Sequence, residues 1–211
     1  MNEHKQREEI VLLGKSMYDR GLTHGGTGNI SVRLNDGWLL TPTGSSLGRL
    51  DPARLSKLDW QGRHIGGDLP SKEAMLHLAM YQERPVSGAV VHLHSTHSVA
   101  VSVLDQLDPE DVLPAITAYY AMRVGKLPLV PYYAPGDPAL AEAVRRFSGR
   151  HHAMLLAHHG PVVAGSDLHA AVDATEELEA TAQLFLLLFQ HKFKTLTPEQ
   201  VADLQRRFAK R

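Results

Sequence analysis

The chain has 211 residues, of which 43% are hydrophobic, and its formal net charge at pH 7 is -1. This length suits one large domain, and the near-neutral charge provides no positive field of the kind that binds nucleic acid. The absence of cysteine excludes disulfides, thiolate metal ligands and cysteine nucleophiles, whereas 13 histidines point to imidazole chemistry.

The first part of the sequence predicts a helix, a glycine-rich loop and three short strands. Apolar residues at helical spacing predict a helix over residues 3–20, and Gly21 supplies its stop signal. Four glycines between residues 21 and 28 predict a loop with unusual backbone angles. Turn residues then separate three strand-like segments, at residues 30–34, 38–41 and 55–59.

Helices and strands alternate in the rest of the sequence. We expect helices at residues 71–82 and 98–104, on either side of a strand at residues 89–94. A second strand at residues 153–157 lies between helices at residues 137–147 and 168–191, and a last short helix begins near Pro198. Consecutive strands indicate antiparallel pairing in part of the sheet. We therefore predict a single α/β domain with a mixed central sheet and helices on both faces.

Neither a membrane segment nor a secretory signal is expected. No apolar run is long enough to span a bilayer, and the charged N-terminal stretch lacks an apolar core. A sequence without cysteine is also compatible with a reducing compartment. We expect a cytoplasmic protein that contacts neither membrane nor nucleic acid.

The sharpest chemical motif is a pair of histidines in the strand predicted at residues 89–94. Because strand side chains alternate between faces, His92 and His94 point the same way, while Val91 and Leu93 point into the opposite layer. Two imidazoles on one strand face can share a single divalent cation. The alternative is a pair of polar histidines on a solvated strand face.

A third imidazole can come from His158 or His159, which follow the strand predicted at residues 153–157. Gly160 lets the chain turn sharply at the strand end, where the active sites of open sheets usually lie. Only one of these two histidines needs to be a ligand.

Ser71, Lys72 and Glu73 open a predicted helix and have two interpretations. Helix amides, the Ser71 hydroxyl and the Lys72 ammonium can form an anion site, with Glu73 beside it. Alternatively, Ser71 is only the N-cap and Glu73 only complements the helix dipole. One turn later, His77 is expected to pack in the core, and support of the site is its alternative role.

Two loops offer backbone amides and hydroxyls that bind oxyanions. They are Gly25-Gly26-Thr27-Gly28-Asn29 and Thr41-Pro42-Thr43-Gly44-Ser45-Ser46. The first loop lacks the spacing of a nucleotide-binding motif and precedes a strand rather than a helix. The sequence therefore does not support a nucleotide site.

Taken together, these segments resemble the class II aldolase/adducin family, which includes L-fuculose-phosphate aldolase and L-ribulose-phosphate 4-epimerase. The resemblance spans about residues 5–190 and depends on five motifs in the same order. The motifs are Gly28-Asn29-Ile30-Ser31-Val32-Arg33, Thr41-Pro42-Thr43-Gly44, Ser71-Lys72-Glu73, His92-Leu93-His94-Ser95 and His158-His159-Gly160.

The resemblance implies a three-layer α/β/α fold with a mixed, largely antiparallel sheet, and a homotetramer with sites between neighbouring subunits. It implies that His92, His94 and His159 bind a divalent metal, most commonly Zn2+, although such ligands also accept Mn2+ and Co2+. The family glutamate corresponds to Glu73, which would ligate the resting metal and act as acid and base. The phosphate-binding positions of the family correspond to Asn29, Thr43, Gly44 and Ser71.

Three features resemble one branch of the family, the 3-oxo-tetronate 4-phosphate decarboxylases. Lys72 stands where aldolases and epimerases usually have a second serine, and the other features are His94-Ser95-Thr96 and residues 123–128. This branch decarboxylates a phosphorylated keto acid to dihydroxyacetone phosphate and CO2 through a metal-bound enediolate. Lys72 would hold the phosphate, and Tyr119 is the candidate proton donor to carbon, with a packed aromatic as its alternative role.

Three other functions compete with decarboxylation. A sugar-phosphate aldolase or 4-epimerase of the fuculose- or ribulose-phosphate type would use the same fold and metal with a different leaving group. A non-catalytic adducin-like interaction module would be expected to lose metal ligands, whereas all four are present. A metal-storage protein would have no need of phosphate-binding loops beside the ligands.

Overall fold

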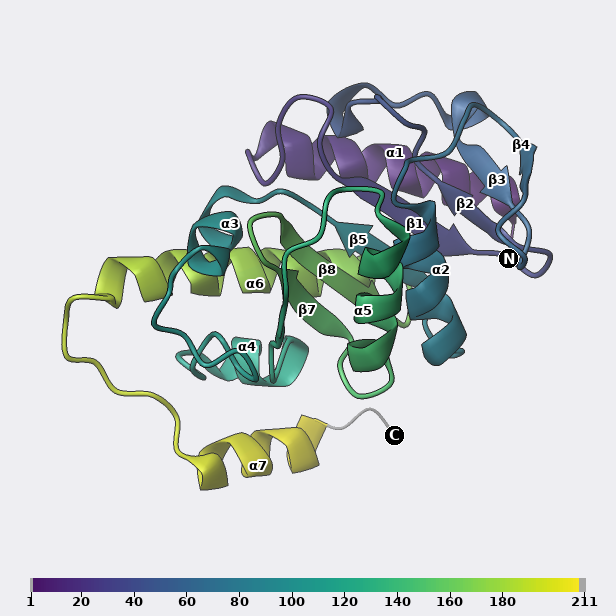
Figure 1. Cartoon of the computed structure of the whole chain (residues 1–211). Helices are drawn as coiled ribbons and strands as arrows, with labels where there is room; N and C mark the ends of the chain where they lie inside the picture. Colours follow the sequence, from purple (N-terminus) through teal and green to yellow (C-terminus); the bar gives the residue numbers. More distant parts are fainter. Residues whose placement is uncertain (1, 209–211) are drawn as a thin grey trace.

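The computed structural model describes residues 2–208 as one sheet covered by helices on both faces (Figure 1). Its eight strands lie in the order β4-β3-β2-β1-β5-β8-β7-β6. Neighbouring strands are antiparallel except β6 and β7, which are parallel. The predicted mixed, largely antiparallel sheet is therefore confirmed. Met1 and residues 209–211, the ends of the expected domain 1–211, lie outside the described residues.

The strands are short, and those at the centre of the sheet are the most buried. In chain order they are β1 (Asn29–Arg33), β2 (Trp38–Leu40), β3 (Ser56–Leu58), β4 (His64–Gly66), β5 (Ala89–His92), β6 (Leu129–Val130), β7 (Ala153–Leu156) and β8 (Gly160–Gly165). The helices are α1 (Glu3–Asp19), α2 (Ala74–Glu83), α3 (Thr96–Ser102), α4 (Ala118–Arg123), α5 (Pro138–Ser148), α6 (Leu168–Leu188) and α7 (Pro198–Phe208), with two short 3₁₀ helices, η1 (Leu47–Arg49) and η2 (Pro52–Arg54).

Helices α2 and α5 cover one face of the sheet, and α1, α3, α4 and α6 cover the other. The alternation of side chains along β5 separates the two cores. Val90 packs in the core under α2 and α5, whereas Val91 and the following Leu93 pack in the core under α1 and α6. The expectation that Val91 and Leu93 point into the layer opposite the histidines is confirmed.

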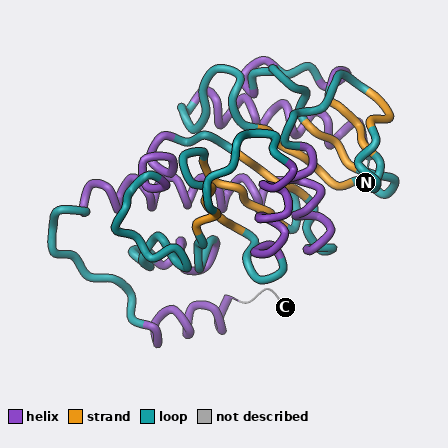
Figure 2. Tube along the Cα trace, in the orientation of Figure 1, coloured by secondary structure: helices purple, strands orange, loops and turns teal. Residues whose placement is uncertain are grey.

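Helix α7 follows an extended segment and lies beside α4, away from the sheet (Figure 2). Together with α7, the helices on the two faces of the sheet include every helix expected from the sequence. Within the described range, no helix combines the length and the apolar character that crossing a membrane requires.

Side-chain caps set where two of the predicted helices begin. The Asn2 side chain accepts a hydrogen bond from the backbone amide of His4 at the start of α1. This helix ends before Gly21, whose φ of 76° suits a glycine. Asp137 caps α5, with Pro138 in the first turn, where its missing N–H costs nothing.

Several predicted boundaries are shifted by a few residues, and two of these shifts change where expected site residues lie. Helix α2 begins at Ala74 rather than at residue 71, because residues 71–73 form a turn in which Ser71 Oγ accepts from the Glu73 amide at 3.3 Å. Ser71 is therefore not the N-cap of α2; Glu73 has that position and makes no capping hydrogen bond with its side chain. Strand β5 ends at His92, so His94 lies beyond the strand.

The sequence prediction missed β4, β6, β8 and α4. The omission of β8 matters most, because this strand lies in the middle of the sheet beside β5. Its segment begins with Gly160 and Pro161, and its residues are buried on both faces, so no polar and apolar alternation marks it.

Candidate metal centre

The metal ligands expected from the sequence meet at one end of β5. His92 is the last residue of this strand, and His94 follows two residues later. His159 lies in the loop between β7 and β8, and the antiparallel pairing of β8 with β5 brings that loop beside His92. Gly160 permits the approach: its φ is 148°, and a Cβ atom there would lie 2.1 Å from the Leu93 carbonyl oxygen.

Three imidazoles and one carboxylate converge at this point. The Nε2 atom of His92 lies 3.2 Å from Nε2 of His94 and 3.3 Å from Nε2 of His159. Glu73 completes the group, with Oε2 3.4 Å from Nε2 of His92 and Oε1 3.1 Å from Nε2 of His159. One ligand atom from each of the four side chains lies within 4.8 Å of all the others.

Glu73 reaches the histidines because it immediately precedes the first turn of α2. The residue is only 8% exposed, and its side chain points to the sheet rather than back to its own helix. Asn29 of β1 lies opposite His92 in the strand ladder, and its Nδ2 donates to Glu73 Oε2 at 2.7 Å. The cluster and its Asn29 contact thus come from four segments of the chain, which are strand β1, the turn before α2, β5 and the β7–β8 loop.

Burial determines the protonation of two cluster histidines, His92 and His94. It lowers the pKa of His94 to about 3 and also lowers the pKa of His92. Burial alone would raise the pKa of the Glu73 carboxyl, but His92, His159 and the Asn29 amide outweigh it and hold that pKa well below its usual range. Near neutral pH, His92 and His94 are therefore uncharged and Glu73 is ionised, as metal ligands must be.

The hydrogen bonding at the cluster fits a divalent cation. His92 donates its Nδ1–H to the Pro161 carbonyl oxygen at 2.8 Å, so its Nε2 carries only a lone pair toward His94 and His159. Glu73 Oε1 is buried, and apart from its 3.1 Å ion-pair contact with His159 Nε2 it accepts no hydrogen bond from the described residues. A cation would satisfy the imidazole nitrogens and this oxygen together, and such ligands suit zinc and related ions.

The loops expected to bind phosphate lie beside this cluster. The Thr43 amide donates to the Leu69 carbonyl at 2.9 Å, which holds the loop of Thr43 and Gly44 next to the turn at Ser71. Ser71 Oγ in turn accepts from Asn29 Nδ2 at 3.3 Å. The structure thus joins Asn29 to both Ser71 and Glu73, and it ties the loop of Thr43 and Gly44 to the segment that leads to Ser71.

Comparison with known proteins agrees with this arrangement. The family model described as the Class II Aldolase and Adducin N-terminal domain matches residues 8–186. The chain belongs to this family. A 3-oxo-tetronate 4-phosphate decarboxylase from Haemophilus influenzae is 54% identical over 98% of this chain and 99% of its own length. An L-fuculose phosphate aldolase from Escherichia coli K12 is 36% identical over 99% of this chain and 96% of its own.

A solved structure supports the same fold. The crystal structure of YgbL from Escherichia coli, described as an aldolase, epimerase or decarboxylase, is similar with a TM-score of 0.94 and 45% identity. The similarity covers 96% of this chain and 99% of that one. The class II aldolase fold of the chain is therefore shown by sequence and by structure.

Of the two adjacent histidines, His159 belongs to the cluster of this class II aldolase domain and His158 does not. His158 is exposed, has a φ of 57°, and places its ring 5.9 Å from that of Tyr132. His159 is buried, with its Nε2 toward His92. The choice that the sequence left open is thus decided by the geometry of the loop.

Two other predicted residues lie outside the cluster of Glu73 and the histidines. Lys72 is exposed and faces the loop at Gly136, where an added Cβ atom would lie 3.4 Å from the Lys72 Cβ. Tyr119 lies on α4, where it is 59% exposed and its ring centroid is 5.5 Å from the Arg123 guanidinium. The packed aromatic of this segment is its neighbour Tyr120, which is 1% exposed.

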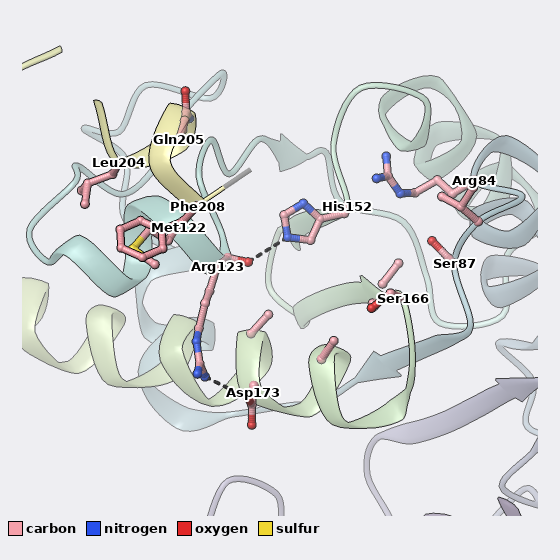
Figure 3. Close-up of a pocket in the computed structure, with 15 residues that line it drawn as sticks. Arg84, Ser87, Met122, Arg123, His152, Ser166, Asp173, Leu204, Gln205 and Phe208 are labelled. Carbon is pink, nitrogen blue, oxygen red and sulfur yellow. Dashed lines mark hydrogen bonds and ion pairs between the residues drawn. The ribbon is translucent and has the colours of Figure 1, made fainter. Parts of the chain in front are cut away.

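A cavity of about 720 Å³ lies elsewhere, between α7 and the C-terminal end of β8 (Figure 3). Among the described residues, its lining includes none of the four cluster side chains. Its polar groups are largely paired: His152 Nε2 contacts the Arg123 carbonyl oxygen at 2.9 Å, and Arg123 pairs with Asp173 at 3.1 Å. Size alone therefore does not make this cavity the active site, and the unsatisfied ligand atoms identify the cluster instead.

One group that orients the cluster was not found from the sequence. The Pro161 carbonyl oxygen, which sets the tautomer of His92, is a backbone atom of β8. A backbone acceptor leaves no residue-type signal, and β8 itself was not predicted.

Proposed function

We propose that this chain is a metal-dependent carboxy-lyase that converts a 3-oxo-tetronate 4-phosphate to dihydroxyacetone phosphate and CO2. The observation that carries the proposal is the convergence of three imidazoles and the Glu73 carboxylate beside the phosphate-binding loops. The identity of 54% to a decarboxylase of that name supports the substrate class. Lys72, which departs from the aldolase pattern, supports the same branch.

We assign the metal ligands to His92, His94, His159 and Glu73. The ligand set favours Zn2+ and is compatible with Mn2+ or Co2+. When bound, the cation would polarise the substrate ketone and stabilise the negative charge that develops as CO2 leaves. Glu73 is only 8% exposed, so the protein keeps bulk water away from this charge.

The side chains around the cluster bind the substrate and move its protons. Decarboxylation breaks the bond between C1 and C2 and leaves the electron pair on C2, which must then gain a proton. Glu73 holds the proton of the C2 hydroxyl, and Tyr119 is the proposed donor to carbon. Lys72 adds positive charge to the phosphate site formed by Asn29, Thr43, Gly44 and Ser71.

We also propose that the whole chain forms one domain. The protein would be a homotetramer in the cytoplasm. Tyr119 is 59% exposed on α4, so its hydroxyl is available to a site on a neighbouring subunit. Such sharing would explain why this side chain lies outside the cluster of its own chain.

A sugar-phosphate aldolase is the second candidate, because the L-fuculose phosphate aldolase of Escherichia coli K12 is 36% identical along nearly the whole chain. An aldolase would use the same ligands but release an aldehyde instead of CO2. A non-catalytic, adducin-like module is less well supported, because four ligand side chains converge here.

The test is to supply the Zn2+-loaded protein with 3-oxo-tetronate 4-phosphates or with L-fuculose 1-phosphate, and to measure CO2 and aldehyde. We expect CO2 and dihydroxyacetone phosphate in equal amounts from the keto acid. Glu73→Gln should lower kcat by about 10²- to 10⁴-fold, the range of acid–base catalysis, with an unchanged circular dichroism spectrum. Aldehyde release without CO2 would establish the aldolase, and no turnover with no bound metal would establish the binding module.

A further inference from the structure

Behind Glu73, a row of buried polar side chains runs away from the cluster between α2 and β1. The helix contributes His77 and Tyr81, four residues apart, and the strand contributes Asn29 and Ser31, two residues apart. Four helical residues and two strand residues each advance by about 6 Å, so the two rows remain in step. This match of lengths lets each helix residue face a strand residue.

Hydrogen bonds join the row into a continuous chain. The Tyr81 hydroxyl lies 2.8 Å from Ser31 Oγ, and Ser31 Oγ lies 2.7 Å from His77 Nδ1. His77 Nε2 contacts Asn29 Oδ1, and Asn29 Nδ2 donates to Glu73 Oε2 at 2.7 Å. The chain thus ends on the carboxylate that we assign to the metal.

Which atom donates in each of these hydrogen bonds follows from Glu73, the acceptor at the end of the row. An ionised Glu73 only accepts, so Asn29 must turn its NH2 group toward Glu73 and its oxygen toward His77. That oxygen requires a hydrogen on His77 Nε2, which leaves Nδ1 to accept from the Ser31 hydroxyl. The Ser31 oxygen then accepts from Tyr81, so each of these side-chain N–H and O–H donors has an acceptor.

Because these side chains are buried, water cannot easily take the place of their hydrogen bonds to one another. His77 and Ser31 are fully buried, Tyr81 is 2% exposed, and the indole of Trp38 stacks on the His77 ring with centroids 6.3 Å apart. Burial also lowers the pKa of His77 to about 3, so the ring is neutral and carries a single N–H. A neutral ring with one N–H donates from one nitrogen and accepts at the other.

We infer that His77 is a positioning residue for the metal centre, because its Nε2–H holds the Asn29 oxygen in the orientation that the Glu73 carboxylate requires. With its oxygen held by His77, Asn29 presents only N–H groups to Glu73 and Ser71. A reversed amide would place its oxygen against the carboxylate, which would repel it. The inference rests on the proposed role of Glu73 as metal ligand and acid–base group.

The test compares two polar substitutions at the same buried position. The amide nitrogen of His77→Gln reaches the place of Nε2 and can donate to Asn29, whereas that of His77→Asn reaches only the place of Nδ1. We expect His77→Gln to bind Zn2+ within about threefold of the unsubstituted protein in competition with a chromogenic chelator. We expect His77→Asn to bind 10- to 100-fold more weakly, as when an outer partner of a ligand is lost.

A second measurement separates this inference from the proposed reaction. At saturating Zn2+, kcat for CO2 release should fall 10- to 100-fold in His77→Asn and recover in His77→Gln. If the Zn2+ affinities follow the expected order but no protein releases CO2, the positioning role stands and the proposed reaction fails. His152→Asn is the matched control, because His152 also uses Nε2 on a backbone or amide oxygen but lies at the distant cavity.

Equal Zn2+ affinity and equal kcat in the Gln and Asn variants would overturn the inference. If either variant fails to fold, 15N NMR of the unsubstituted protein decides instead. We expect the neutral ring of His77 with its hydrogen on Nε2. A neutral ring with its hydrogen on Nδ1 would overturn the inference as well.

Discussion

Burial acts on two kinds of histidine near the site. For His92 and His94 it keeps the ring neutral, so that Nε2 is available to a cation. For His77 it keeps a single N–H, which is directed at the Asn29 oxygen in the hydrogen-bond chain behind Glu73. The same burial lowers the stability of the fold in acid. The histidines of the unfolded chain can bind protons, whereas the buried rings of the folded chain cannot.

The metal-free protein should therefore lose stability in mild acid, in part through His77. The folded pKa of His77 is about 3, below the value near 6.5 of an unfolded histidine. The unfolded state binds the extra proton as the pH falls below about 6.5, so stability is lost progressively from there toward pH 3. His77 alone should account for about 2 kcal/mol of the loss between pH 7 and pH 5.

Urea unfolding at these two pH values, for the unsubstituted protein and His77→Gln, measures this contribution. The variant should lose about 2 kcal/mol less of its unfolding free energy, because glutamine does not titrate. His92 and His94 keep their own contributions in both proteins, so the difference isolates His77. An identical loss in the two proteins would contradict the buried, neutral state of this ring.

At the scale of elements, α6 anchors the helix that follows the metal-binding strand. Helix α3 begins two residues after His94, and buried Glu179 of α6 lies at its first turn. The carboxylate accepts from the His97 amide at 2.9 Å, the Ser98 amide at 2.9 Å and the Ser98 hydroxyl at 2.7 Å. Glu179 thus caps the N-terminus of α3, although it belongs to another helix.

Glu179→Ala should lower the free energy of unfolding by about 2–3 kcal/mol, because it leaves buried donors without their charged acceptor. Glu176→Ala, one turn earlier on α6, is the matched control. Glu176 pairs with Arg20 at the surface, so its loss should cost less than about 1 kcal/mol. Denaturant unfolding of the two variants measures both values, and equal losses would show that Glu179 is not the anchor of α3.

The elements that could be predicted from sequence are those whose pattern is local. The helices α1, α5 and α6 have caps or stop signals at their ends and one apolar face, and their predicted extents agree closely with the structure. Strand β8 is buried on both faces and β6 has only two residues, so neither carries an alternating pattern. The turn at residues 71–73 depends on contacts with β1, which no local pattern reports.

At the scale of the whole molecule, the candidate site depends on pairings between distant segments. The central position of β5 between β1 and β8 brings Asn29, His92 and His159 together from three parts of the chain. The five ordered motifs indicated which residue types would meet, through the family resemblance. The orientation of Asn29, the support from His77 and the exposed position of Tyr119 required the structure, because each depends on tertiary contacts.

The measurement that tests the account most directly is the Zn2+ affinity and stoichiometry of three metal-stripped proteins. They are the unsubstituted chain, His159→Ala and His158→Ala, which differ at adjacent positions of one loop. We predict one Zn2+ per chain, bound equally well after His158→Ala. His159→Ala should weaken binding by more than about 100-fold, because a lost ligand costs more than a lost outer partner. Equal affinity in the two variants would contradict a shared cation held by His92, His94, His159 and Glu73.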